Sequence, residues 1–182
     1  VPTAPLPMAA LAPEHRARFA GRARQLSARS GYDFAGALGP RAAPPGVVGP
    51  ADRFRGLALA MEAKSGASKT SLEIGREGAK AKSKGLAEHQ LRALAEAWRD
   101  FGVVAVVVWR AGDFRGVLLP PAVLGAWTRY EATSRLPPEH RRRGDLSIAR
   151  SAFEPYNLVA GRFEDWLLPV RHWLARKDSP GP

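Results

Sequence analysis

The chain has 182 residues, and its 28 Lys and Arg against 17 Asp and Glu give a formal net charge of +11. It contains no Cys, which excludes a disulfide framework and a thiolate zinc site, and its four His residues have no metal-ligand spacing. Oxygen ligands are therefore expected for any metal. The basic charge favours an anionic partner, and nucleic acid is the favoured one.

We expect a single domain over residues 13–176, between a Pro/Ala-rich tail at 1–12 and a short tail at 177–182. The first stretch is interrupted by proline and lacks a basic leader, and no apolar run approaches the length of a membrane span. These features predict a cytoplasmic protein with no membrane partner.

The first predicted helix covers residues 13–29, because Pro13 suits the first helical position and Ser30-Gly31 ends the pattern. Beside its apolar stripe lies a polar edge made of Glu14, Arg18, Arg22, Gln25 and Arg29. Two interpretations stay open. The edge is either a solvated face with one ion pair, or it faces a phosphate backbone and lends Glu14 to a metal site.

Residues 31–49 are rich in Gly, Pro and Ala and predict a loop that contains Asp33. Residues 47–54 are expected to form a short strand in a hairpin with residues 56–64. Such a hairpin would bring Asp52 close to Glu62, so the spacing favours Asp52 over Asp33 as the upstream acid.

Residues 56–64, G-L-A-L-A-M-E-A-K, predict a buried strand. With a period of two, one face presents Leu57, Leu59, Met61 and Ala63, and the other presents Ala58, Ala60, Glu62 and Lys64. A carboxylate and an ammonium on one face at the end of a buried strand can hold a divalent metal and stabilise an anionic transition state. The competing interpretation is an exposed ion pair worth under ~1 kcal/mol.

A third strand is expected at 70–74, followed by a mobile basic loop at 75–85. This loop lies between the strand with Glu62 and the next helix, where it can close on a DNA backbone; a solvated charge run is the alternative. The expected nucleic-acid contacts are basic residues of the first helix and of this region: Arg18, Arg22, Arg29, Lys69, Arg76, Lys80, Lys82 and Lys84.

The helix at 86–101 has the clearest pattern, with an apolar face of Leu91, Leu94, Ala95 and Trp98 and a stop at Gly102. Gln90 lies in the first turns at the edge of that face, so it can point inward toward the site. A central strand at 103–109, a second strand at 115–120 and a short helix at 121–127 follow. Residues 146–153 and 162–175 are predicted to be helical, the latter with a break at Pro169. Trp127, Trp166, Leu167 and Trp173 are expected in the core or in a subunit interface.

The segments M-E-A-K-S-G-A-S-K-T-S-L, E-H-Q-L-R-A-L, V-V-A-V-V-V-W and G-V-L-L-P occur in this order within residues 50–128. Together they resemble the RecU family of Holliday junction resolvases, in the PD-(D/E)xK nuclease superfamily. The resemblance implies an α/β, restriction-endonuclease-like fold with a central mixed sheet flanked by helices. It also implies a homodimeric, Mg²⁺-dependent endonuclease, in which Mn²⁺ can substitute, acting on four-way or branched DNA in recombination and repair without a small-molecule cofactor.

On the family pattern Asp52, Glu62 and Lys64 take the catalytic positions, Gln90 matches the H-Q and Glu14 the acid of the first helix. The shorter interval from Asp52 to Glu62, the reduced stalk at 40–50 and the inserted loop at 75–85 indicate a divergent or bacteriophage-type member. The resemblance therefore implies a bacterial cell or a phage-infected host.

Asp52 and Glu62, with the Ala63 carbonyl, would bind one or two Mg²⁺, and either Glu14 or Asp33 would complete the metal site. Lys64 would orient the attacking water or stabilise negative charge. Two other functions stay open. One is a restriction-like or repair endonuclease on duplex DNA, and the other is a non-catalytic DNA-binding protein in which Glu62 and Lys64 are a structural pair.

Overall fold

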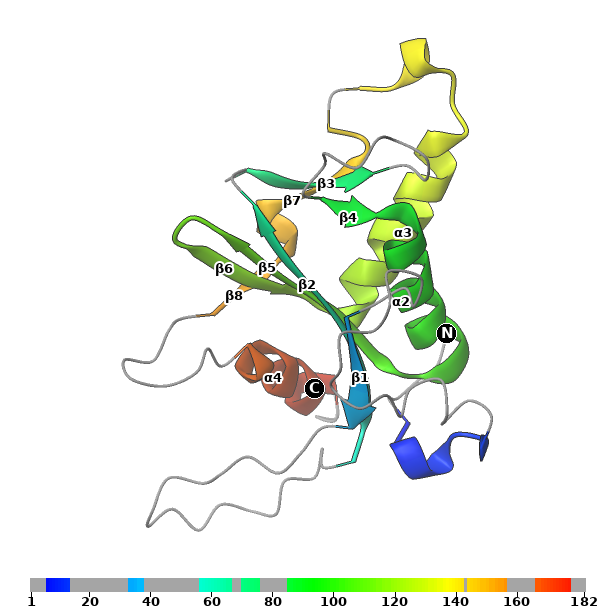
Figure 1. Ribbon diagram of the computed structural model, residues 1–182, viewed down its shortest axis with the longest axis vertical. Coiled ribbons are helices and arrows are strands. Elements are labelled where there is room, and N and C mark those ends of the chain that lie inside the picture. The colour runs from blue at the N-terminus through cyan, green and yellow to red at the C-terminus, as the bar shows by residue number, and fades with distance from the viewer. Residues whose placement is uncertain are drawn as a thin grey trace.

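A computed structural model of the chain describes residues 6–13, 33–37, 56–66, 70–75, 85–142, 144–156 and 166–177. The elements in these ranges form a five-stranded mixed sheet and, at one end of it, a three-stranded sheet. Helices α2 (Glu88–Phe101) and α3 (Pro120–Ser134) cover one face of the larger sheet, and α4 (Leu167–Lys177) covers the other (Figure 1). The predicted α/β class, with a central mixed sheet flanked by helices, is thereby confirmed.

The larger sheet has the strand order β1, β2, β5, β6, β8. The strands are β1 (Phe34–Ala37), β2 (Ala58–Gly66), β5 (Val104–Ala111), β6 (Phe114–Leu118) and β8 (Glu154–Pro155). Only the β2–β5 pair is parallel; the other neighbours are antiparallel. Because parallel neighbours need a crossover connection, the chain passes through α2 (Glu88–Phe101) between β2 and β5.

The predicted hairpin partner of β2 is wrong over Ala58–Met61. There β1 occupies one edge of β2, with Phe34 opposite Met61, and β5 takes the other edge from Leu59 onward. The segment 47–54 itself lies outside the described residues. Strand β1 falls in the stretch for which a loop was predicted, because its sequence, F-A-G-A, has the Gly and Ala content of a loop.

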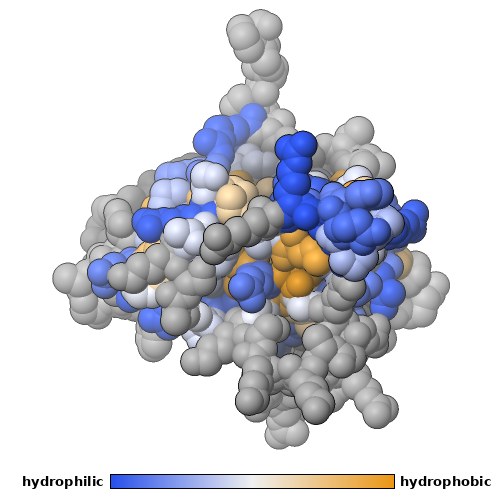
Figure 2. All heavy atoms as spheres, turned by 90° about the horizontal axis from the view of Figure 1, so that it is seen from above, coloured by the Kyte–Doolittle hydropathy of each residue, from blue (hydrophilic) through white to orange (hydrophobic). Residues whose placement is uncertain are grey.

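The smaller sheet has the order β4 (Leu86–Ala87), β3 (Ser71–Gly75), β7 (Ser147–Ala149). The strand predicted at 70–74 is confirmed, whereas the helix predicted at 146–153 is wrong: β7 is followed by the 3-10 turn η3 (Arg150–Ala152). Between α3 and β7, the described residues 135–142 and 144–146 project past the smaller sheet and include η2 (Pro138–His140); we call these residues the arm (Figure 1). Figure 2 views the molecule from this end, where hydrophilic side chains predominate around a smaller apolar area.

The predicted helix at 86–101 is confirmed as α2, with its first two residues in β4 instead. Gly102 ends the helix in the left-handed region, at φ 62°, and its N–H donates to the Trp98 carbonyl at 3.1 Å. Helix α3 (Pro120–Ser134) is longer than the predicted 121–127 and has proline in its first turn, where no N–H is needed.

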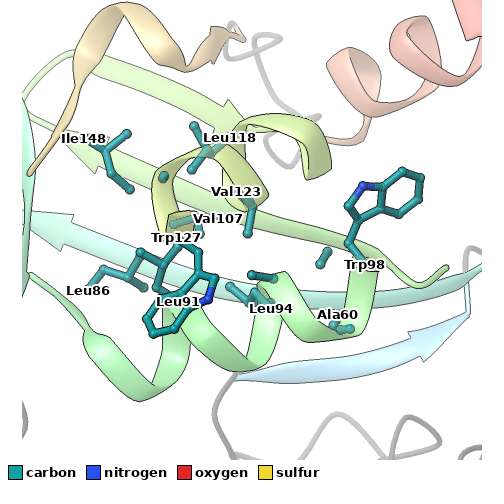
Figure 3. Close-up of a cluster of buried hydrophobic side chains, with 14 of the residues drawn as sticks. Ala60, Leu86, Leu91, Leu94, Trp98, Val107, Leu118, Val123, Trp127 and Ile148 are labelled. Atoms are coloured by element: carbon teal, nitrogen blue, oxygen red, sulfur yellow. The ribbon is translucent and has the colours of Figure 1, made fainter. Parts of the chain in front are cut away.

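Side chains from α2, α3 and both sheets form the main core on one face of the larger sheet (Figure 3). The residues of β2 alternate as predicted: Ala58 and Ala60 belong to this core, while Leu59 and Met61 pack on the opposite face toward α4. Since Glu62 continues the first series, its carboxylate is placed beneath α2.

Helix α4 (Leu167–Lys177) buries Val170 and Leu174 against the second face of the sheet. Pro169 lies in its first turn and therefore does not break it. Trp173 meets Trp98 edge to face at 5.6 Å between ring centroids, and Trp127 is buried in the main core. None of the helices in the described ranges combines the length and apolar character that a membrane span requires.

Candidate active site

The charged side chain at the centre of the site is Glu62, which has no exposed surface. Its Oε1 atom lies 2.6 Å from Lys64 Nζ and accepts a hydrogen bond of 2.5 Å from Gln90 Nε2. Its Oε2 atom is also buried but has no hydrogen-bond partner among the described residues. One oxygen of the carboxylate thus has two polar partners, whereas the other is buried without one among the described residues.

Burial raises the pKa of the Glu62 carboxyl, since removing a carboxylate from water disfavours its charged form. The nearby Lys64 ammonium counteracts this effect, and the negative charge of Asp33 reinforces it. A bound cation would stabilise the ionised form in the same way as Lys64. The site therefore favours occupation by positive charge when Glu62 is ionised.

Lys64 shares the face of β2 with Glu62, as the strand period predicted, and its side chain is 18% exposed. The alternative of an exposed surface ion pair does not describe this geometry, because one partner is fully buried and the other mostly so. The ammonium lies at the boundary between the core and solvent, where an incoming anion can reach it.

Gln90 connects the first turn of α2 to β2, and its side chain points inward to Glu62. Its Oε1 accepts a hydrogen bond from the Ala87 N–H at 3.0 Å while its Nε2 donates to Glu62. The same turn is attached to α3, because the Tyr130 hydroxyl donates to Glu88 Oε2 at 3.0 Å. Gln90 is thereby held in one orientation by both ends of its amide.

Asp33 lies directly before β1, and the pairing of Phe34 with Met61 puts it beside Glu62. Its Oδ2 accepts a hydrogen bond from the Ala63 N–H at 3.0 Å, and the side chain is exposed. In an extended strand the N–H and C=O of one residue point to the same side. The Ala63 carbonyl therefore faces the same edge of β2 as the Asp33 carboxylate.

The Asp33 carboxylate and the Ala63 carbonyl thus face one edge of β2, and the Glu62 carboxylate is close enough to Asp33 to be affected by its charge. Such hard donors suit Mg²⁺, which is commonly bound by one or two carboxylates with water completing its shell. The partnerless buried Oε2 fits this assignment as well. Within the described ranges no group of three His, Asp or Glu side chains gathers into a metal site, so the carbonyl and water would have to contribute.

The sequence ranked Asp52 above Asp33, and the structure brings Asp33 to Glu62, while Asp52 lies outside the described residues. The sequence does not predict β1, and the register of β1 with β2 is what fixes the position of Asp33. The other predicted site residues outside the described ranges are Glu14, Arg18, Arg22, Arg29, Lys69, Arg76, Lys80, Lys82 and Lys84.

No protein-family model matches this chain, and no curated protein sequence matches it.

Proposed function

We propose that this protein is a Mg²⁺-dependent endodeoxyribonuclease that cleaves four-way or branched DNA in recombination and repair, with Mn²⁺ able to replace Mg²⁺. The observation that supports the proposal most is the buried Glu62 carboxylate, bound through one oxygen by Lys64 and Gln90 and left with a partnerless second oxygen. Asp33 lies beside it and accepts a hydrogen bond from the Ala63 N–H.

A divalent cation bound there would neutralise phosphate charge and lower the pKa of a bound water. The protein groups provide the remaining chemistry. Glu62 and Asp33 would position the cation, and Gln90 would keep Glu62 from rotating. Lys64 can donate to a non-bridging phosphate oxygen and stabilise the negative charge that develops during phosphodiester hydrolysis.

The net charge of +11 supports binding to a polyanion, and phosphate contacts position a protein without reading bases. Selectivity for a branched substrate would then come from DNA shape. Because a four-way junction has equivalent strands related by a twofold axis, symmetric cleavage favours a C2 homodimer. Trp127, Trp166, Leu167 and Trp173 do not add support for a dimer, because they pack in or against the chain's own core.

The test is a nicking assay on a synthetic four-way junction and on a linear duplex of the same sequence, with Mg²⁺ or with EDTA. Mg²⁺-dependent paired nicks in the junction, lost in Glu62→Gln and kept in the surface variant Arg176→Ala, are expected. Equal cleavage of the duplex would favour a restriction-like or repair endonuclease. Tight binding with no cleavage under any metal would favour the non-catalytic DNA-binding protein.

A further inference from the structure

A polar groove of about 580 Å³ lies between the smaller sheet and the arm. On one side it is lined by Thr70 and by the outward face of β3, where Ser71 and Glu73 alternate with the buried Leu72 and Ile74. Since alternate residues of a strand face opposite ways, the side chains of Ser71 and Glu73 are directed away from the core. The exposed face of β3 thus forms one wall of the groove.

The opposite wall belongs to the arm and contains Arg141. Its Nη2 donates to the carbonyls of Ser134, at 2.9 Å, and Leu136, at 2.5 Å, and its Nε donates to Leu136 at 2.9 Å. A cation at the carbonyl end of a helix is favoured by the helix dipole, so Arg141 attaches the arm to the end of α3. Its positive charge contributes to the groove while its hydrogen bonds shape the wall.

Arg142 differs from its neighbour. Its backbone N–H donates to Asp145 Oδ2 at 2.5 Å, which fixes the main chain of the arm at this point. Its side chain is exposed, and no described residue pairs with its guanidinium. The groove therefore combines a positioned backbone with an available guanidinium, a group whose geometry suits phosphate.

We propose that this groove binds the phosphodiester backbone of a nucleic-acid strand, with Arg142 as the main contact. The hydroxyls of Thr70 and Ser71 supply further donors on the facing wall. Among the residues that line the groove, Arg141 and Arg142 outnumber Glu73, which opposes an anion. The Asp145 carboxylate, beside the lining, accepts the Arg142 N–H. The proposal rests on the nucleic-acid partner of the proposed function and is independent of catalysis.

The groove and the candidate active site are close enough to contact one DNA molecule. Ser71 follows Lys64 by seven residues, so an extended chain would separate them by at most about 25 Å. That span equals about seven base-pair steps of duplex DNA. Strand β4, which pairs with β3, also leads directly into the helix turn that holds Gln90. Backbone binding in the groove would position a substrate relative to Glu62.

The test measures binding of a fluorescent four-way junction by anisotropy in EDTA, so that no cleavage occurs, between 50 and 200 mM salt. Arg142→Ala should lower the slope of log affinity against log salt concentration by about 0.9. Over this fourfold range of salt concentration, its loss of affinity relative to wild type should therefore be about 3.5-fold larger at the low-salt end than at the high-salt end. Glu73→Gln should tighten binding. Arg176→Ala, an exposed arginine on α4, is the matched control and should change neither quantity.

Arg142→Ala with the slope and affinity of Arg176→Ala would overturn the groove as a phosphate site, and so would wild-type protein that binds no DNA. Circular dichroism should show that each variant is folded, as expected for exposed positions. If the slope falls as stated but no variant cleaves with Mg²⁺, the groove stands and the nuclease proposal fails. If wild type cleaves with Mg²⁺ while Arg142→Ala binds with unchanged affinity and slope, the nuclease proposal stands and the groove proposal fails.

Discussion

Replacing Gln90 by Ala tests the connection between α2 and the buried carboxylate. The change removes a hydrogen bond to Glu62, worth about 1.5–3 kcal/mol because the acceptor is charged. It also removes the acceptor of the Ala87 N–H at the helix start, worth about 1 kcal/mol. The higher helix propensity of Ala returns only a few tenths of a kcal/mol. We expect a net loss of about 3 kcal/mol.

In a chain of this size a loss of 1 kcal/mol lowers Tm by about 2–4 °C, so Gln90→Ala should lower Tm by about 6–12 °C. Thermal and urea unfolding of the metal-free protein would measure it. Arg92→Ala, on an exposed position of the same helix, is the matched control and should stay within about 0.5 kcal/mol of wild type. A Gln90→Ala protein as stable as Arg92→Ala would refute the view that this amide fixes the site.

Three other outcomes are expected. Since burial raises the pKa of Glu62 above its ordinary 4.5, the folded state binds the proton more tightly than the unfolded state does. Metal-free wild type should therefore lose stability relative to Glu62→Gln as pH rises from below 4.5 to neutrality. A difference in the free energy of urea unfolding that stays constant with pH would contradict this. Mg²⁺ at 100 times its Kd should stabilise wild type by about 2.7 kcal/mol in thermal unfolding and should not stabilise Glu62→Gln, with Asp33→Asn intermediate. Gly85→Ala would place a Cβ against the Glu73 carbonyl oxygen and should cost about 1–3 kcal/mol by separating β3 from β4; unchanged urea unfolding would show that the strands can adjust.

Those parts of the site that depend on local periodicity could be predicted from the sequence. The period of two in β2 places Glu62 and Lys64 on one face, and the period of 3.6 in α2 places Gln90 at the edge of its buried face. Both patterns are strong because each element is covered by the core. The crossover from β2 through α2 to β5 then brings Gln90 over Glu62, as the observed hydrogen bond shows.

Features that depend on pairing between distant segments could not be predicted. The position of Asp33 follows from the register of β1 on β2, and nothing in F-A-G-A distinguishes a strand from a loop. The sequence predicts a helix where β7 lies, because three residues are too few to display a strand period. The pairing of β7 with β3 is what makes it a strand. The arm likewise obtains its shape from Arg141, whose contacts with the end of α3 leave no sequence pattern.

The energetics of Glu62 bear on why such a residue is present. Its neighbours on the same face of β2 are Ala58 and Ala60, and an apolar residue at position 62 would continue that core without the cost of burying a charge. Buried ion pairs are often no more stable than well-packed apolar replacements. The hydrogen bond from Gln90 and the ion pair with Lys64 engage only one carboxylate oxygen, so they do not fully compensate for burial. A chain that retains this arrangement gives up stability at one position, which is the pattern expected where a site needs the charge for binding or catalysis.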